Sequence, residues 1–308
     1  MENGLKKNQK TVSRRGFVKG AVLGTAALAL KFKKLRAQAE PAGKTVLFSA
    51  QNPAGKVVLI RNEAAVNEAH AVNARIAAEM IDSAVKTLSG ETDVLKAWDR
   101  FIKPGDTVGV KFTRCDWMRV HTEQAVIDAI VKRLGDLGIP KDRIYTEDGG
   151  LPFKKCTALI NVPTIKIHTL MGIASALKNY INFSDKRSSY HFEGSVKLGE
   201  IWHLPDVKGK TRLVIVDALR PYFGPGPQIN PLHRWDYKGI MASTDPVACD
   251  TVSLKICQAK RTLFKGEEWP INPPPKSIAA ADADYKLGTS DPAKIQLIRL
   301  GWEKGILI

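Results

Sequence analysis

The 308-residue sequence predicts an α/β fold with a mostly parallel sheet and helices on both faces. An apolar segment at residues 107–112, an amphipathic one at 123–137 and a second apolar one at 143–146 follow one another. This is the order of a βαβ unit, whose two strands are parallel. Further apolar segments at residues 158–160 and 213–216 continue the same sheet. The composition, 44% hydrophobic and 25% charged, is that of an ordinary globular chain.

The residues before this unit predict two further strands and two helices. The strands are expected at residues 45–49 and 57–61. A helix is predicted at residues 73–88, because apolar side chains recur there at helical spacing. Gly90 follows it and supplies the left-handed residue that commonly ends a helix. A shorter helix is expected at residues 94–101.

The last third of the chain predicts two helices separated by an irregular segment. Residues 243–250 read S-T-D-P-V-A-C-D, which is typical of a helix start. Thr244 or Asp245 is the expected N-cap, and the proline after them suits the first helical position. Residues 267–277 are rich in proline and predict a surface insertion. A final helix is expected at residues 293–300.

Candidate binding and catalytic side chains are concentrated in residues 161–182, NVPTIKIHTLMGIASALKNYIN. Pro163 is expected to end the preceding strand, because proline cannot continue inside a sheet. The next four residues alternate apolar and polar side chains. In an extended chain, this alternation places Lys166 and His168 on one face.

A helix is predicted to follow, beginning at Leu170 or Met171 and ending near Ile181. It would carry Lys178 and Asn179. Two lysines, a histidine and an amide beside a strand end and a helix start predict a site for an anion. The alternative is that the lysines are solvated and the histidine is partly buried.

These residues resemble the signature of the domain-of-unknown-function 362 family, which is close to N-x-P-x-x-K-x-H-x-x-x-G-x-x-x-A-L-K-N. The matching positions are Asn161, Pro163, Lys166, His168, Gly172, Ala176, Leu177, Lys178 and Asn179. The resemblance spans roughly residues 55–302 and continues in a Gly/Pro-rich loop at 223–227 and in residues 243–250. It implies a fold and the place of a site, and it leaves the reaction open.

Four further residues complete the predicted site. Arg114 follows the strand at 107–112, where open α/β sheets bind ligands. The resemblance implies that His191 is the histidine that recurs after the Lys-Asn pair in relatives, with an exposed loop histidine as the alternative. Asp217 follows a predicted strand and is either a proton acceptor or a cap. Asp250 lies one turn into an apolar helix and therefore needs a partner.

Residues 1–39 predict an export signal. They hold ten Lys/Arg and one acidic residue, so they carry +9 of the net charge of +16. Ser13-Arg14-Arg15-Gly16-Phe17-Val18-Lys19 resembles the twin-arginine motif, residues 21–30 are apolar, and Ala37-Gln38-Ala39 resembles a cleavage site. The alternative is a basic amphipathic N-terminus of a cytosolic protein. Residues 40–308 are interpreted as one domain, exported folded to the periplasm by the twin-arginine translocation machinery.

Features that the sequence lacks disfavour several classes of protein. Residues 40–308 contain no long basic run with interleaved aromatic residues, which disfavours nucleic-acid binding. The apolar part of the leader is too short for a stable transmembrane span, and whether it is cleaved or retained as an anchor stays open. No G-x-S-x-G, G-x-G-x-x-G or Walker motif occurs. The oligomeric state is left open.

The cysteines provide no recognisable metal motif. Cys115, Cys156, Cys249 and Cys257 have neither C-x-x-C nor iron–sulfur spacing. Disulfides are compatible with export, and four free or buried thiols are the alternative. No metal ligands are predicted, and the identity of any cofactor is unknown.

Two classes of function fit these predictions. The first is an exported enzyme, such as a redox enzyme or an isomerase, with a basic, histidine-containing cleft for a small anionic substrate or cofactor. Its predicted catalytic residues are His168, His191 and Asp217. Its predicted binding residues are Arg114, Lys166, Lys178, Asn179 and Asp250. The second class is a non-catalytic periplasmic protein that binds a ligand, a metal or a redox partner.

Overall fold

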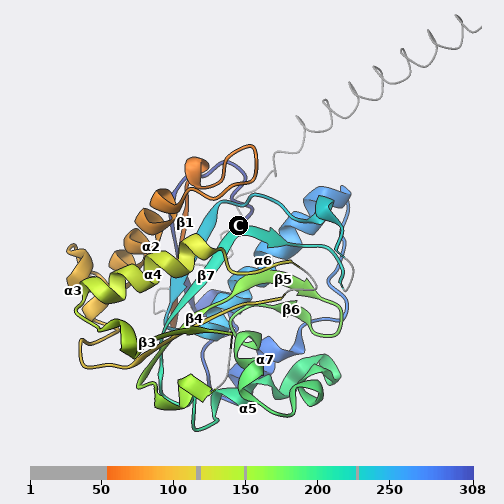
Figure 1. Cartoon of the computed structure of the whole chain (residues 1–308). Coiled ribbons are helices and arrows are strands. Elements are labelled where there is room, and N and C mark those ends of the chain that lie inside the picture. Colours follow the sequence, from red (N-terminus) through yellow and green to blue (C-terminus); the bar gives the residue numbers. More distant parts are fainter. Residues whose placement is uncertain (1–53, 116–118, 149–150, 227–228) are drawn as a thin grey trace, which may run out of the picture. The chain divides into compact units, whose positions relative to one another are not determined.

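Apolar segments distributed along the chain form the strands of the central sheet. A computed structural model describes residues 54–115, 119–148, 151–226 and 229–308 (Figure 1). All of the described residues belong to a single compact unit of the chain. The strand predicted at residues 45–49 lies outside them.

The described residues form a nine-stranded sheet. Seven strands follow one another across it in the order β3 (Ile144–Glu147), β2 (Val108–Phe112), β4 (Ala158–Val162), β7 (Thr211–Tyr222), β8 (Gly239–Ser243), β1 (Gly55–Arg61) and β9 (Ile295–Gly301). Strand β5 (Thr164–His168) pairs with β7 and with β6 (Gly172–Ala174). Most of the pairs are parallel, but β8 is antiparallel to both of its neighbours. The predicted α/β fold with a mostly parallel sheet is therefore confirmed.

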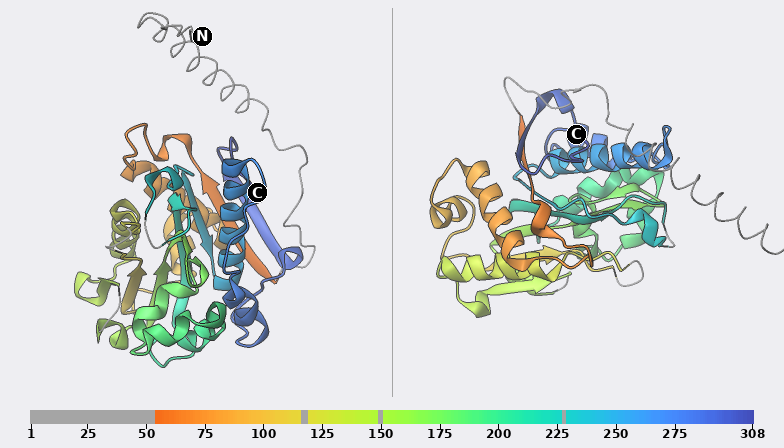
Figure 2. Two further views of the ribbon diagram at one scale, coloured as in Figure 1. Left: turned by 90° about the vertical axis from the view of Figure 1, so that its right-hand side faces the viewer. Right: turned by 90° about the horizontal axis from the view of Figure 1, so that it is seen from above.

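Helices cover both faces of the sheet (Figure 2). On one face, α2 (Ala74–Ser89), α3 (Val94–Asp99) and α4 (Gln124–Asp136) share a core with Val58, Ile160 and Ile215 of the strands. On the other, α5 (Gly199–Trp202), α6 (Pro246–Lys265) and α7 (Lys276–Ala283) share a core with Leu159, Ile165 and Val216. Short 3-10 helices connect these elements at Glu63–Ala65, Lys141–Arg143, Leu151–Lys155, Lys178–Phe183, Arg187–His191, Glu193–Leu198, Pro231–His233 and Pro292–Lys294.

The C-cap of α2 and the N-cap of α6 agree with the sequence predictions, and Asn73, predicted as the first helical residue, is the N-cap of α2. The Asn73 side chain accepts a hydrogen bond from the Ile76 N–H, and Gly90 ends α2 with a φ of 80°. The Asp245 side chain accepts one from the Ala248 N–H at the start of α6. These interactions satisfy backbone groups that a helix end leaves without partners, which explains why the caps could be recognised from sequence.

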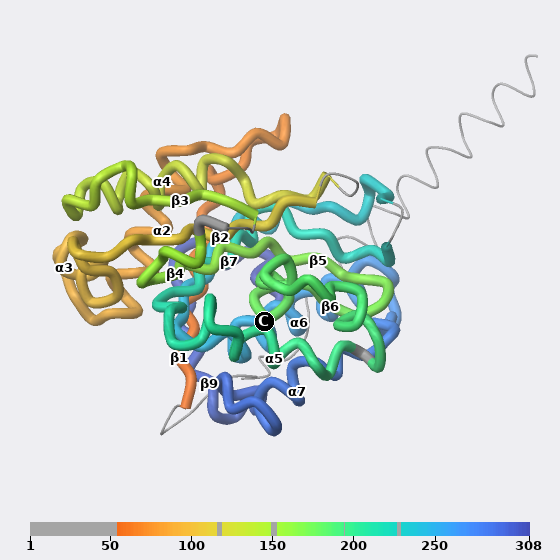
Figure 3. Tube along the Cα trace, turned by 60° about the horizontal axis from the view of Figure 1, so that its bottom comes forward, coloured from red at the N-terminus to blue at the C-terminus, as the bar shows by residue number. Residues whose placement is uncertain are grey.

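The helix predicted from Leu170 or Met171 to Ile181 is wrong. Residues 169–171 form a turn, and β6 then pairs antiparallel with β5, so that His168 lies opposite Gly172 (Figure 3). Gly172 has a φ of 80°, which L-residues rarely adopt. A 3-10 helix begins only at Lys178. The chain therefore returns along β5 instead of extending away from it.

We expect that replacing Gly172 with alanine destabilises the hairpin. A Cβ atom there would lie 2.5 Å from the Pro273 carbonyl oxygen, in addition to the strain of the left-handed backbone. The loss in free energy of unfolding should exceed about 1 kcal/mol. Gly90→Ala is the matched control, because Gly90 also has a φ of 80° but a Cβ there would meet nothing within 4 Å. Equal losses in chemical denaturation would show that the contact with residue 273 does not matter.

The helix predicted at residues 293–300 is also wrong, because this segment forms β9. It pairs in parallel with β1, with Gly55 opposite Ile295 and Arg61 opposite Gly301. Arg61 reinforces the pairing: its guanidinium donates to the Trp302 and Lys304 carbonyls. The β-branched residues in the segment favour a strand once a partner is present.

Strand β7 is longer than the strand predicted at residues 213–216. It runs from Thr211 to Tyr222, so Asp217 lies inside the strand and not after its end. The Pro-rich residues form a loop that leads into α7, and this loop packs against Gly172. Among the described residues, we find no helix that is both long and apolar enough to cross a membrane.

Candidate functional site

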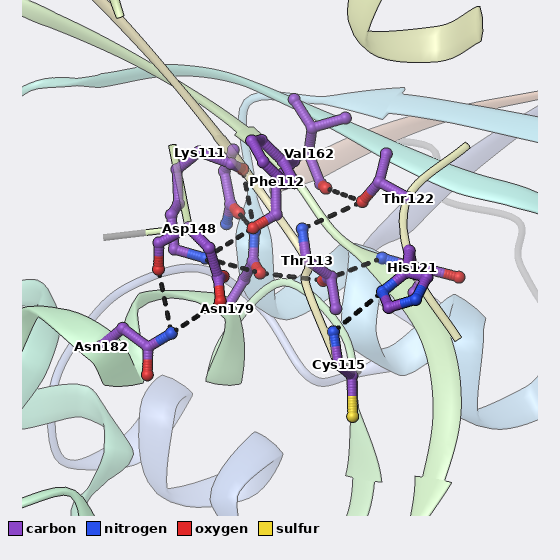
Figure 4. Close-up of polar contacts among 12 residues, drawn as sticks. Lys111, Phe112, Thr113, Cys115, His121, Thr122, Asp148, Val162, Asn179 and Asn182 are labelled. Carbon is purple, nitrogen blue, oxygen red and sulfur yellow. Dashed lines mark hydrogen bonds and ion pairs between the residues drawn. The ribbon is translucent and has the colours of Figure 1, made fainter. Parts of the chain in front are cut away.

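A buried lysine near the end of β2 anchors a polar network. Lys111 is 1% exposed, and its ammonium group donates to Asp148 Oδ1 at 2.6 Å, to the Phe112 carbonyl at 2.6 Å and to Asn179 Oδ1 at 3.2 Å (Figure 4). Burial lowers the pKa of Lys111 to about 8, and the Asp148 carboxylate opposes that effect. Asn182 donates to the second oxygen of Asp148 at 3.0 Å and thereby holds the acid in place.

Asn179 uses its whole amide group within the protein. Its Oδ1 accepts hydrogen bonds from Lys111 Nζ at 3.2 Å and from Thr113 Oγ1 at 2.9 Å. Its Nδ2 donates to the Lys111 carbonyl at 3.0 Å and to Asn161 Oδ1 at 2.7 Å. Asn161 in turn donates to the Ala176 carbonyl at 3.0 Å. Both N–H groups and both lone pairs of the Asn179 amide are thus occupied, so its role is to fix the chain beside Lys178 and not to hold a ligand.

Lys166 and Lys178 lie beside this network without acceptors of their own. Lys166 is 6% exposed, and burial lowers its pKa to about 8; Cys115 opposes that shift, and Lys178 adds to it. Burial also lowers the pKa of Lys178, again opposed by Cys115. Within the part of the chain that the structure describes, neither ammonium group has a hydrogen-bond or ion-pair partner. The β5–β6 hairpin reverses the chain direction and so brings Lys178 near Lys166. The predicted helix would have carried Lys178 away from Lys166.

The two histidines of the predicted site lie side by side. The ring centroids of His168 and His191 are 5.4 Å apart. Burial lowers the pKa of His168 to about 3, and the positive charge of Lys178 lowers it further. Burial and Lys178 also lower the pKa of His191. Both rings are therefore neutral near pH 7.

Backbone hydrogen bonds place the proton on different nitrogen atoms in the two rings. His168 Nδ1 accepts from the Leu170 N–H at 3.2 Å, so its proton is on Nε2. His191 Nδ1 lies 2.9 Å from the Arg187 carbonyl and must donate to it, which leaves its Nε2 as an acceptor. The pair thus combines a proton donor and a proton acceptor. We call Lys111, Lys166, His168, Lys178 and His191 the lysine–histidine cluster.

We expect His168 to stay neutral throughout the range in which ordinary histidines titrate. Its pKa near 3 lies below the usual value of 6.5. In a ¹⁵N spectrum of the imidazoles, His168 should keep the signature of a ring protonated at Nε2 from pH 5 to 8. A His168 midpoint near pH 6.5 would contradict the partly buried, cation-flanked environment.

Asp217 does not join this cluster. Its carboxylate accepts from the Glu123 N–H at 2.7 Å and from the Leu219 N–H at 2.9 Å, and thereby caps the start of α4. Burial raises the pKa of Asp217 to about 7, and the charged neighbours that affect it are Glu123 and Arg234. In β7 it lies on the same face as Ile215, toward α2 and α4. The capping alternative considered for this acid is the one that its contacts support.

Asp250 was predicted to need a polar partner, and its carboxylate accepts hydrogen bonds from two backbone N–H groups. It is 2% exposed on α6 and accepts from the Ala176 N–H at 2.6 Å and from the Leu177 N–H at 3.1 Å. Burial raises its pKa to about 7, and these two N–H groups oppose that effect. Asp250 therefore positions the segment that carries Lys178. Arg114 is exposed on the loop after β2, one position before Cys115.

Sequence reasoning missed Lys111 and Cys115. A lysine inside the apolar strand V-G-V-K-F was the available signal for the first, because a buried ammonium group requires partners. Cys115 had no such signal, since its relation to Lys166 depends on how β2 and β5 are placed. Within the described ranges, no three His, Cys, Asp or Glu side chains gather as a metal site would require.

One protein-family model matches the part of the chain that contains most of the site residues. Residues 118–255 match the family model described as "Domain of unknown function (DUF362)". This part of the chain is similar to the DUF362 family, in agreement with the resemblance predicted from the sequence. The DUF362 match contains Lys166, His168, Lys178 and His191, whereas Lys111 precedes it. Searches of curated proteins and of solved structures found no match.

Proposed function

We propose that the lysine–histidine cluster binds a small anion, which is the substrate or cofactor of an exported enzyme. The observation that carries the proposal is the pair of ammonium groups on Lys166 and Lys178 without acceptors among the described residues. A buried charge is costly unless it is paired, and a bound anion supplies the missing partner.

The charges of the cluster favour a ligand with two negative charges. Asp148 balances Lys111, while Lys166 and Lys178 are left over. Side-chain atoms that are fully enclosed without a partner are confined, in the described ranges, to Ser195 Oγ and His233 Nδ1. The Nζ atoms of both lysines therefore retain contact with solvent, from which an anion can reach them.

The histidine pair supplies proton chemistry beside the bound anion. His168 Nε2–H is a donor and His191 Nε2 an acceptor, so the pair suits a reaction that moves a proton, as in an isomerase or a redox enzyme. The second candidate function is a non-catalytic periplasmic protein that binds a ligand, a metal or a redox partner. The two unpaired lysines serve such a protein equally well, so this candidate differs from the first in turnover and not in the site.

Thermal unfolding with inorganic phosphate tests the anion site. We expect phosphate to raise the melting temperature more than sodium chloride does at the same ionic strength. The effect should disappear in Lys166→Met and persist in Lys132→Met, because Lys132 is exposed on α4 and paired with Asp136. Equal stabilisation by both salts in the unmodified protein would contradict the proposal.

Native mass spectrometry and an absorption spectrum of protein purified from its own host separate the two functions. A bound cofactor of defined mass supports the enzyme. Binding of a small anion, with no cofactor and no conversion of the anion by the host extract, supports the binding protein.

The export part of the proposal rests on the resemblance of residues 13–19 to the twin-arginine motif. Replacing Arg14 and Arg15 with lysine should leave the precursor in the cytoplasm, because the translocation machinery reads the arginine pair. Cell fractionation followed by immunoblotting measures this. Replacing Lys6 and Lys7 with arginine is the control and should leave export unchanged. Mature protein outside the cytoplasm in the first variant would refute the assignment.

A further inference from the structure

Cys115 differs from the other three cysteines in its exposure. None of the four forms a disulfide in the described residues, but Cys115 is partly exposed while the others are buried. Burial raises the pKa of Cys156 to about 11 and that of Cys257 to about 12, and it also raises the pKa of Cys249. Because the thiolate is the nucleophilic form, these three thiols are unreactive in the folded chain.

The loop that carries Cys115 is fastened to the sheet. The Cys115 N–H donates to His121 Nδ1 at 3.0 Å. The Thr113 N–H donates to Thr122 Oγ1 at 3.0 Å, and that hydroxyl donates to the Val162 carbonyl of β4 at 2.7 Å. Figure 4 shows the sulfur of Cys115 pointing away from the His121 ring. The sulfur is thus held in place while it stays free of the hydrogen bonds that fix its backbone.

The loop that carries Cys115 lies beside the two lysines that lack acceptors. Thr113 Oγ1 donates to Asn179 Oδ1, next to Lys178, at 2.9 Å and accepts from the Thr164 N–H of β5 at 3.3 Å. Apart from burial, Cys115 is the leading influence on the pKa of both Lys166 and Lys178, and it raises both. Lys166 is more than nine-tenths buried and has no partner in the described chain. A thiol on the loop after β2 thus lies near two unpaired cations, one in β5 and one at the start of the 3-10 helix Lys178–Phe183.

We propose that Cys115 is a nucleophile of the lysine–histidine cluster, and that it reacts with small electrophiles whose negative charge is held by Lys166 and Lys178. The proposal rests on the anion site proposed above and names the substrate class of that site. The lysines would raise the local concentration of the anion and orient it toward the sulfur.

Alkylation by iodoacetate reproduces the proposed step with a defined probe. The sulfur forms a bond to the CH₂ carbon, the carbon–iodine bond breaks, and iodide leaves with the electron pair. The thiol proton passes to the buffer, so neither an oxidant nor a reductant is needed. Iodoacetamide undergoes the same displacement without a negative charge. The ratio of the two rates at one cysteine therefore measures how strongly its surroundings favour an anion.

The experiment compares these rates at Cys115 in the folded chain by peptide mass spectrometry. We expect the ratio of the iodoacetate rate to the iodoacetamide rate to exceed that of glutathione in the same buffer. Each of Lys166→Met and Lys178→Met should lower the ratio by about fivefold, the effect of one charge at close range in water. Lys132→Met should leave it unchanged. In the unmodified protein, rising salt should lower the ratio, which gives a test that requires no variant.

The outcomes separate this proposal from the anion site itself. A ratio equal to that of glutathione and insensitive to salt, or no reaction at Cys115 with either reagent, would overturn the role of the thiol. Phosphate binding by Cys115→Ser is then decisive for the other proposal. If that variant still binds phosphate, the anion site stands without a nucleophile; if no form of the protein binds phosphate, the site itself fails.

Discussion

Replacing Lys166 with methionine is expected to stabilise the protein at pH 7 while abolishing anion binding. Methionine has a similar length and suits a buried position. The pKa of Lys166 falls from 10.5 to about 8, and each unit corresponds to about 1.4 kcal/mol. The gain in free energy of unfolding is therefore at most about 3 kcal/mol. A residue that costs stability without its ligand is typical of a binding site.

The gain should depend on pH in a defined direction. A lysine whose folded pKa is lowered binds fewer protons in the folded state than in the unfolded state, so its cost is greatest at low pH. The cost is complete below about pH 8, declines between pH 8 and 10.5, and is absent above that range. Denaturant unfolding of the protein and of Lys166→Met should accordingly give curves that converge as the pH rises through this window.

Lys111→Met is the matched control, because the pKa of Lys111 is also lowered to about 8. Its ammonium group has Asp148 and two other acceptors, however, and methionine would leave these without a donor. We expect a loss of about 2–4 kcal/mol for this substitution. If both variants lose stability at pH 7, Lys166 has an acceptor in the folded protein, and the observation behind the proposed function is mistaken.

Replacing Asp250 with alanine is expected to cost about 2–6 kcal/mol, because it leaves two buried N–H groups unsatisfied at roughly 1–3 kcal/mol each. These are the N–H groups of Ala176 and Leu177. Because they precede Lys178, the same substitution should also weaken phosphate binding. Thermal unfolding with and without phosphate measures both effects.

Asp250→Asn is the informative companion. Its side-chain oxygen can still accept from one of the two N–H groups, so it should retain more stability and more phosphate binding than the alanine variant. If Asp250→Ala unfolds at the same temperature as the parent and binds phosphate equally well, the carboxylate does not position the segment.

Local signals in the sequence account for the elements that were predicted well. The caps of α2 and α6 involve residues within three or four positions, so they can be read from a short window. The turn at Gly172 cannot be predicted from a short stretch of sequence, because it depends on contact with Pro273 and Pro275, about a hundred positions away. Strand β9 likewise requires β1 as its partner, and without it the apolar residues suggest a helix.

The same distinction explains the candidate site. Lys166 and His168 could be placed together because they alternate along one extended segment. Asp217 could not be placed, because β7 continues past it and its position in the strand decides which face it reaches. Lys111 reaches the cluster, and Cys115 lies beside it, through the packing of β2 beside β4 and the contact of β2 with Asn179, which no local pattern encodes.

The pairing of β1 with β9 has a consequence for the order in which the chain assembles. Arg61 and Lys304, which are joined across it, are 243 positions apart in the sequence. Closing so large a loop is slow, and contacts of this kind form late in folding. Until β9 arrives, one side of β1 has unpaired backbone N–H and C=O groups, which can pair with another chain. During synthesis, β1 therefore keeps one unpaired edge until residues 295–301 have been made.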